Sequence, residues 1–239
     1  MSTAVAAAPP AALSMMPALV EATSALRAGR CALFTGISWD EYESLLDWRD
    51  EHRRGARLAY DRGELEIMVT TGTRERLKGV LALLIEAWMS EIGGDCTTFG
   101  NMTHRRADLE RGLEPDECFY IQNWAAVAGV RDIDFAKDPP PDLAVEIEVS
   151  RTVLSRLPIY AALKVPEVWR YDGTQLTILL LQPDDTYTES LTSSALPTLP
   201  VAELAPFLAL AADVTLSNSA IDRQFRAWVR SRPPAPPTP

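Results

Sequence analysis

Residues 138–149 read DPPPDLAVEIEV, a run of prolines followed directly by residues that favour a β-strand. Proline cannot continue a helix or donate a hydrogen bond within a sheet, so the run ends the preceding segment and a strand starts after it. Side chains alternate between the two faces of a strand. One face is therefore predicted to carry the apolar side chains of Leu143, Val145, Ile147 and Val149. The opposite face is predicted to carry Ala144, Glu146 and Glu148.

Two carboxylates on one face of an apolar strand indicate either a functional site or an exposed sheet edge. At about 3.3 Å of rise per residue, Glu146 and Glu148 lie roughly 7 Å apart, so both could reach one cation or one proton. An edge strand with both side chains in water is the simpler interpretation. The apolar and proline flanks, a second acidic run at residues 114–117 and Arg156 downstream favour a site.

Length and charge restrict the class of protein. The 239 residues suffice for one large domain or two small ones, and 47% hydrophobic with 23% charged residues is ordinary for soluble domains. The formal net charge is −10, whereas a general nucleic-acid binder needs clustered Lys and Arg. The charge counts against nucleic acid as a partner, although a metal-dependent nuclease also carries several acidic ligands.

Cysteine and histidine usage narrows the chemistry further. The three cysteines, Cys31, Cys96 and Cys118, have no CxxC spacing, which indicates neither a disulfide framework nor a zinc site and favours a reducing, cytoplasmic location. The two histidines, His52 and His104, leave acid–base chemistry to carboxylates. No apolar run approaches the roughly 18 residues that cross a membrane.

The chain divides into four predicted parts: a disordered Ala/Pro-rich leader at 1–20, a main domain at 21–212, a C-terminal helix at 213–232 and a Pro-rich tail at 233–239. Ser38 and Glu41 form an S-x-x-E capping box that begins a helix, and the turn at 61–63 joins two strands into a hairpin. Further helices are predicted at 19–28, 74–92, 153–163, 201–211 and 218–230, and further strands at 167–171, 175–181 and 187–191. This order predicts an α/β domain with a mixed β-sheet flanked by helices.

Three sequence blocks carry a resemblance to a known family. They are GLEPDECFYI at residues 112–121, DPPPD followed by EIE at 138–148, and IYAAL with VPEVWRY at 159–171. Over roughly residues 35–210 the chain resembles the Uma-two family, bacterial proteins described as restriction endonucleases. The resemblance implies the restriction-endonuclease-like core of the PD-(D/E)xK superfamily, in which a mixed β-sheet is flanked by helices. It also implies metal-dependent hydrolysis of phosphodiester bonds.

The family pattern gives roles to four residues. Asp116 matches the first acidic residue and Glu146 the (D/E) of the motif, while Glu148 stands where the superfamily usually has Lys. Arg156 replaces the Lys that many relatives carry four residues before the tyrosine matched by Tyr160. The resemblance therefore implies Asp116, Glu146 and Glu148 as ligands of Mg²⁺ or Mn²⁺, and Arg156 as a group that stabilises charge developing on the phosphate. The missing Lys leaves its usual role unassigned.

Three functions remain open at this stage. The first is a nuclease that acts on nucleic acid, with DNA expected, as a homodimer that pairs two active sites. The second is a catalytically degenerate nuclease fold that binds nucleic acid or protein, and the third is a carboxylate-based hydrolase such as a glycosidase. Asp142 is a rival for the acidic role, although the prolines before it favour a loop position. Both nuclease interpretations require Asp116, Glu146 and Glu148 to converge in space.

Overall fold

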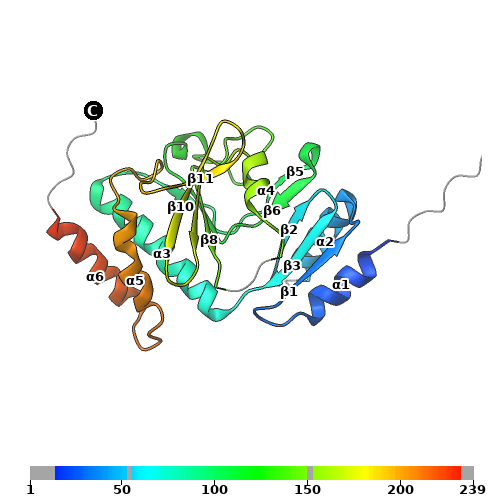
Figure 1. The fold of residues 1–239 in the computed structure, drawn as a ribbon, viewed down its shortest axis with the longest axis horizontal. Coiled ribbons are helices and arrows are strands. Elements are labelled where there is room, and N and C mark those ends of the chain that lie inside the picture. Colours follow the sequence, from blue (N-terminus) through cyan, green and yellow to red (C-terminus); the bar gives the residue numbers. More distant parts are fainter. Residues whose placement is uncertain (1–13, 53–54, 150–152, 233–239) are drawn as a thin grey trace, which may run out of the picture.

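Two β-sheets organise the part of the chain that the computed structural model describes, residues 14–52, 55–149 and 153–232 (Figure 1). The larger sheet has the strand order β11-β10-β9-β8-β7-β4, in which β8 pairs with β9 in parallel and the other neighbours are antiparallel. Its strands are β4 (Thr97–Thr98), β7 (Glu117–Tyr120), β8 (Leu143–Ile147), β9 (Glu167–Tyr171), β10 (Leu176–Leu181) and β11 (Tyr187–Ser190). The sheet is therefore mixed, as predicted.

The second sheet was not predicted as a separate unit. Its strands follow the order β1-β3-β2-β6-β5, and all the pairs formed by described residues are antiparallel. They are β1 (Cys31–Thr35), β2 (Ala56–Asp61), β3 (Glu64–Val69), β5 (His104–Arg106) and β6 (Arg111–Leu113). β2 and β3 form the hairpin predicted at the turn of residues 61–63. The predicted α/β class is confirmed, with one sheet more than expected.

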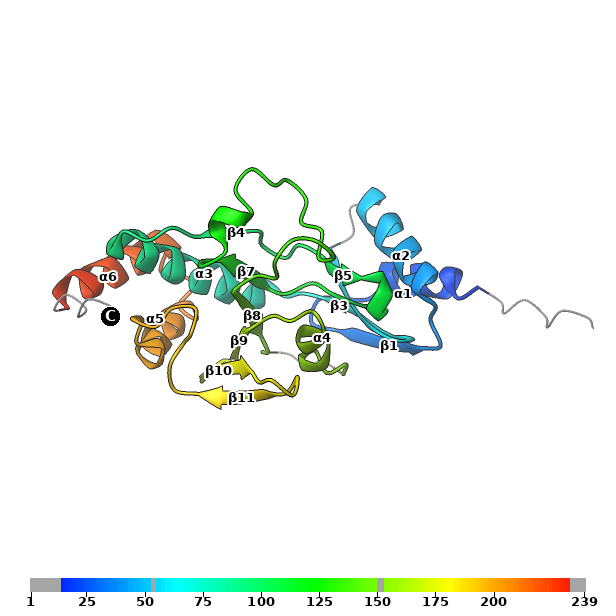
Figure 2. The same cartoon turned by 90° about the horizontal axis from the view of Figure 1, so that it is seen from above.

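Helices lie at both ends of an elongated molecule and along its length (Figures 1 and 2). α1 (Met16–Ala25) and α2 (Trp39–Glu51) lie beside β1 to β3, while α5 (Ala205–Leu210) and α6 (Asn218–Ser231) lie at the opposite end. α3 (Gly72–Ile92) connects the two halves, and α4 (Leu157–Ala162) follows β8. Three short 3-10 helices are η1 (Ala107–Leu109), η2 (Trp124–Ala126) and η3 (Val201–Leu204).

Strand β8 lies inside the larger sheet, and its two faces pack against different cores. Leu143, Val145 and Ile147 belong to the largest core cluster, together with the apolar stripe of α3. Ala144 packs on the other side with residues of α4, Tyr160 among them. The predicted alternation of β8 is therefore confirmed, and it places Glu146 on the α4 side.

Local signals fix the ends of the two helices that frame the site. The Ser38 hydroxyl accepts from the Glu41 N–H, and a Glu41 carboxylate oxygen accepts from the Ser38 N–H, so the predicted capping box of α2 is confirmed. Thr71 caps α3, and Gly93 ends it with φ +72°, a conformation that only glycine adopts without strain. These two caps hold the first turns of α2 and α3 in place.

Three predicted boundaries are wrong. Residues 16–20 are helical instead of disordered, because Leu19 on α1 is completely buried in the core of the five-stranded sheet. The helix predicted at 153–163 begins only at Leu157, because Pro158 has no N–H and fits only a first turn. The segment 201–211 is divided between η3 and α5, with Pro206 in the first turn of α5. Residues 1–13 of the predicted leader and the tail at 233–239 lie outside the described residues.

The predicted division treats the C-terminal helix as a separate part, but in the structure this helix packs into the main core. Ile221 and Phe225 of α6 are fully buried, and they belong to the same core cluster as Val145 and the stripe of α3. Residues 213–232 therefore complete the main core.

Candidate active site

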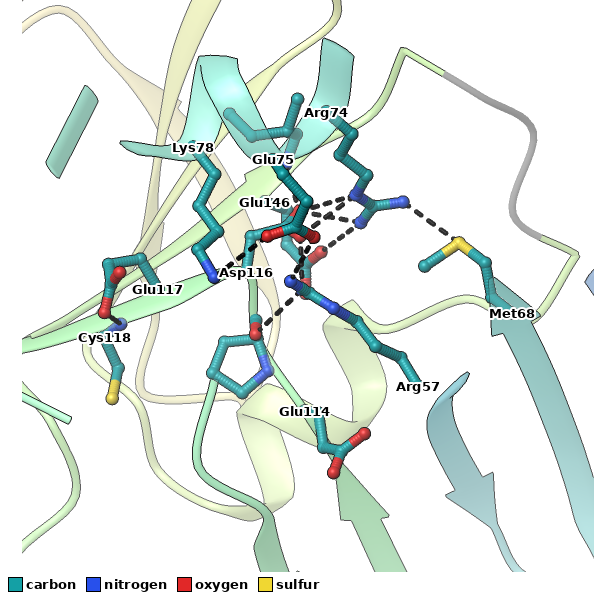
Figure 3. A network of polar contacts seen from close by, with 12 residues as sticks. Arg57, Met68, Arg74, Glu75, Lys78, Glu114, Asp116, Glu117, Cys118 and Glu146 are labelled. Atoms are coloured by element: carbon teal, nitrogen blue, oxygen red, sulfur yellow. Dashed lines mark hydrogen bonds and ion pairs between the residues drawn. The ribbon is translucent and has the colours of Figure 1, made fainter. Parts of the chain in front are cut away.

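Asp116 lies immediately before β7 and is 0% exposed. Its N–H donates to the Val145 carbonyl at 3.0 Å, and its Oδ2 accepts from the Ile147 N–H at 2.6 Å, so the residue is tied to β8 by its backbone and by its side chain. The guanidinium of Arg74 donates to both Asp116 oxygens, with Nη2 2.7 Å from Oδ2 and Nε 3.0 Å from Oδ1. Arg57 donates to Oδ1 from another side (Figure 3).

The charge state of Asp116 follows from these contacts. Burial raises the pKa of this carboxyl, but the guanidiniums of Arg74 and Arg57 and the Ile147 N–H lower it by more. The pKa of Asp116 therefore lies below its ordinary value, and the group is an anion fully paired with arginine.

Glu146 on β8 is 2% exposed and has a separate set of donors. Nη1 of Arg156 lies 3.1 Å and 3.0 Å from its two oxygens, and the Tyr160 hydroxyl donates to Oε1 at 2.5 Å. Nη2 of Arg74 lies 3.4 Å from Oε2, so one nitrogen contacts both Asp116 and Glu146. Burial, followed by the charge of Glu146, raises the pKa of Tyr160 and keeps its hydroxyl a donor.

Glu148 lies just beyond β8, at the rim of the site. Its side chain is 32% exposed, and Oε2 lies 3.5 Å from Nε of Arg170. Burial raises the pKa of Glu148 above its ordinary value. The nearby charge of Arg170 lowers this pKa in part, and that of Glu146 raises it further. Glu146 and Glu148 both line a cavity of about 220 Å³, together with Arg156, Tyr160 and other residues. Asp116 and Glu146 share Arg74, and Glu146 and Glu148 share this cavity, which Asp116 does not line.

The sequence interpretation missed most of the groups that neutralise the site. The buried arginines Arg49, Arg57 and Arg74 and the buried carboxylates Glu66 and Glu114 were not predicted to take part. Glu66 on β3 accepts from the Val153 and Leu154 N–H groups at 2.5 Å and 3.1 Å, and Nη2 of Arg156 lies 3.5 Å away.

The position of Arg74 in the sequence already indicates that its side chain is buried. It lies three residues before Leu77 and seven before Leu81, on the same apolar stripe of α3. A charged residue on a buried stripe requires a buried partner of opposite charge. Glu66 interrupts the apolar β3 in the same way.

Asp142 has the structural role expected for a loop residue. Its carboxylate accepts from the Ile121 N–H at 2.6 Å, the Asn123 N–H at 2.9 Å and the Asn123 side-chain amide at 2.7 Å. These bonds close the loop after β7, so Asp142 is not available to the site.

The donor set does not fit a divalent cation as it is arranged. Both oxygens of Asp116 and both oxygens of Glu146 accept hydrogen bonds from arginine. The surrounding buried groups are four guanidiniums and four carboxylates. They are Arg49, Arg57, Arg74 and Arg156, and Glu66, Glu114, Asp116 and Glu146. Among residues 14–52, 55–149 and 153–232, no three His, Cys, Asp or Glu side chains are grouped to hold a metal ion. The ligand roles predicted for Asp116, Glu146 and Glu148 remain predictions.

Comparison with known proteins identifies the family. A family model described as Uma2, "putative restriction endonuclease", matches residues 39–215. The chain belongs to the Uma2 family. A crystal structure described as a "putative nuclease belonging to DUF820" from Anabaena variabilis is similar over 70% of this chain and 90% of that one, with 13% identity and a TM-score of 0.39. No curated protein matches. Within the described residues, no helix is long and apolar enough to span a membrane.

Proposed function

We propose that this Uma2 protein is a catalytically degenerate nuclease fold that binds nucleic acid, with DNA expected, without hydrolysing it. The supporting observation is that every oxygen of Asp116 and Glu146 already accepts a hydrogen bond from a buried arginine. Removing one partner from such a buried ion pair is strongly unfavourable, so these carboxylates are poor ligands for a metal. The family supplies the expectation of nucleic acid as the partner.

The phosphate backbone is proposed to bind beside the first turns of α3. A polar cavity of about 360 Å³ lies there, and its charged lining consists of three cations, Arg49, Arg57 and Lys78, and three carboxylates, Asp50, Glu75 and Glu114. Glu75 accepts from Nη2 of Arg57 at 3.1 Å and lies 3.3 Å from Nζ of Lys78 (Figure 3). Its side chain is 42% exposed, so its carboxylate could swing away and leave both cations to a phosphate.

Binding and cleavage are tested on the same preparation. Fluorescence anisotropy with labelled single-stranded and double-stranded DNA and RNA, in EDTA, is expected to show binding that weakens steeply with salt. Lys78→Ala is expected to weaken it and Glu75→Gln to strengthen it. A cleavage screen on the same nucleic acids in Mg²⁺ and in Mn²⁺ is expected to show no scission. Absence of binding to every nucleic acid would overturn the proposal.

The family match favours a second candidate function, metal-dependent hydrolysis. In that case Asp116, Glu146 and Glu148 would be the Mg²⁺ or Mn²⁺ ligands, and the Arg74 guanidinium would have to leave the first two. Scission that needs metal and disappears in Glu146→Ala would establish this function in place of binding alone. Cutting both strands would also favour a homodimer, which light scattering at micromolar concentration tests.

A further inference from the structure

We propose that the Arg74 guanidinium stands in for a bridging cation between Asp116 and Glu146, so that shortening this one side chain opens a divalent metal site. The inference rests on the proposed function in one respect, that these two carboxylates are the remnant of a catalytic pair. It adds the identity of the single residue that closes the site to metal.

Arg74 alone among the described residues donates hydrogen bonds to both carboxylates. Its Nη2 lies 2.7 Å from Asp116 Oδ2 and 3.4 Å from Glu146 Oε2. By contrast, Arg57 contacts Asp116 together with the exposed Glu75, and Arg156 contacts Glu146 together with Glu66. The positive charge between the two carboxylates is therefore that of Arg74.

The protein holds this guanidinium rigidly. Arg74 is 1% exposed, and its Nη1 lies 3.0 Å from the Met68 sulfur. Its N–H donates to the Thr71 hydroxyl that caps α3, so its backbone is fixed in the first turn of the helix. Asp116 is equally fixed, because it bonds to the backbone of β8 at Ile147. Glu146 is held by Arg156 and Tyr160, so both carboxylates keep contacts that do not involve Arg74.

Charge then favours a divalent cation in the vacated space. In Arg74→Ala, Asp116 Oδ2 keeps the Ile147 N–H and Glu146 Oε2 keeps Nη1 of Arg156, but both oxygens lose the donor that they share. Two close carboxylates without a cation between them repel each other and are destabilising when buried. A cation that prefers oxygen ligands, such as Mn²⁺, would relieve this repulsion and stabilise the folded state by mass action.

Thermal unfolding of the wild type and of four variants, in EDTA and in millimolar MnCl₂, tests the inference. Arg74→Ala is expected to melt below the wild type in EDTA and to gain about 5 °C or more in Mn²⁺. Arg74→Lys keeps a positive charge at this position and is expected to show no Mn²⁺ response. Arg223→Ala removes an exposed arginine from α6 and serves as the control for nonspecific metal effects. The gain should disappear in the double variant Arg74→Ala with Glu146→Gln.

Two outcomes would overturn the inference: no Mn²⁺-specific gain in Arg74→Ala, or an equal gain in the wild type. If Arg74→Ala does not fold in EDTA, its refolding in MnCl₂ and in KCl is compared by circular dichroism. Recovery in MnCl₂ alone supports the inference, and equal recovery or equal failure in both salts contradicts it. These results are separate from the nucleic-acid assays, because none of them depends on binding or cleavage by the wild type.

Discussion

The Tyr160 hydroxyl donates to a carboxylate that is almost completely removed from water. It lies 2.5 Å from Glu146 Oε1, and Tyr160 itself is 0% exposed. Hydrogen bonds to a buried charge are stronger than those to a neutral carbonyl, because the charged partner is poorly solvated without them. The tyrosine therefore contributes to stability through the charge of Glu146.

Tyr160→Phe is expected to lower the free energy of unfolding by about 1.5–3 kcal/mol, the range for a bond to a charged partner. Tyr187→Phe is the matched control, because the Tyr187 hydroxyl donates to the neutral Val165 carbonyl at 2.5 Å. That variant is expected to lose only about 0.5–1.5 kcal/mol. Urea denaturation at pH 7 measures both, and equal losses would show that Glu146 is not the strongly interacting anion described above.

His104 is a second buried titratable residue, away from the carboxylates. It is 0% exposed, packs against Phe135 with ring centroids 4.3 Å apart, and has no hydrogen-bond partner for either ring nitrogen within the described part of the chain. Burial lowers its pKa from 6.5 to about 3. Below pH 6.5 His104 therefore binds a proton in the unfolded chain, whereas in the folded protein it binds one only below about pH 3.

Stability should consequently fall as the pH drops below 6.5. At about 1.4 kcal/mol per pH unit for one group, the wild type is expected to lose up to about 2 kcal/mol between pH 6.5 and pH 5 relative to His104→Leu. Urea unfolding across pH 5–8 measures the difference, which should be constant above pH 7, where the histidine is neutral in both states. A difference that is constant over the whole range would contradict the buried, neutral state of His104.

At the scale of elements, the sequence predicts the strands and helices whose pattern is local. The alternation in β8, the capping box of α2 and the glycine after α3 each depend on neighbouring residues, and the structure has them as expected. The shortened α4 is also local in cause, because Pro158 restricts where that helix begins. The pairing of strands into two sheets depends on distant segments, which no local pattern reveals.

In the candidate site, the sequence likewise indicates some residues, and only the fold reveals their partners. The alternation of its strand indicates Glu146, the resemblance to the family indicates Asp116, and the structure brings the two together. Their arginine partners come from β2, the start of α3 and the segment before α4, far apart along the chain. A sequence pattern can indicate that Arg74 is buried, but only the three-dimensional packing shows which carboxylates it joins.

Gly112 on β6 shows how tightly the second sheet packs on α2. A side-chain Cβ at this position would collide with the ring of Tyr42, which is 0% exposed and stacks on Tyr60 with centroids 4.9 Å apart. Because the stacked ring has nowhere to move, Gly112→Ala is expected to cost about 1–3 kcal/mol of stability.

Gly94→Ala is the matched control for Gly112→Ala. A Cβ at Gly94 also makes a close contact, at 2.6 Å, but with the terminal methyl of Met89. That methyl lies at the end of a flexible side chain, so the substitution is expected to be tolerated. Chemical denaturation compares the two variants, and an equal loss in both would contradict the fixed position of Tyr42.

At the scale of the whole molecule, the fold places an internally neutralised centre where the two sheets meet α3. Arg57 comes from the five-stranded sheet, Glu146 from the six-stranded sheet, and Arg74 from the helix that connects the two halves. The ion pairs therefore join both halves of the molecule. Although the chain has a formal net charge of −10, each of these buried carboxylates is paired with a buried guanidinium.

The most direct measurement is anomalous diffraction from crystals of the wild-type protein soaked in MnCl₂. We expect the Arg74 guanidinium to be in contact with Asp116 and Glu146, and no manganese peak within bonding distance of either carboxylate. A manganese ion that bridges Asp116 and Glu146, with Arg74 displaced from both, would contradict the closed site and would favour metal-dependent hydrolysis.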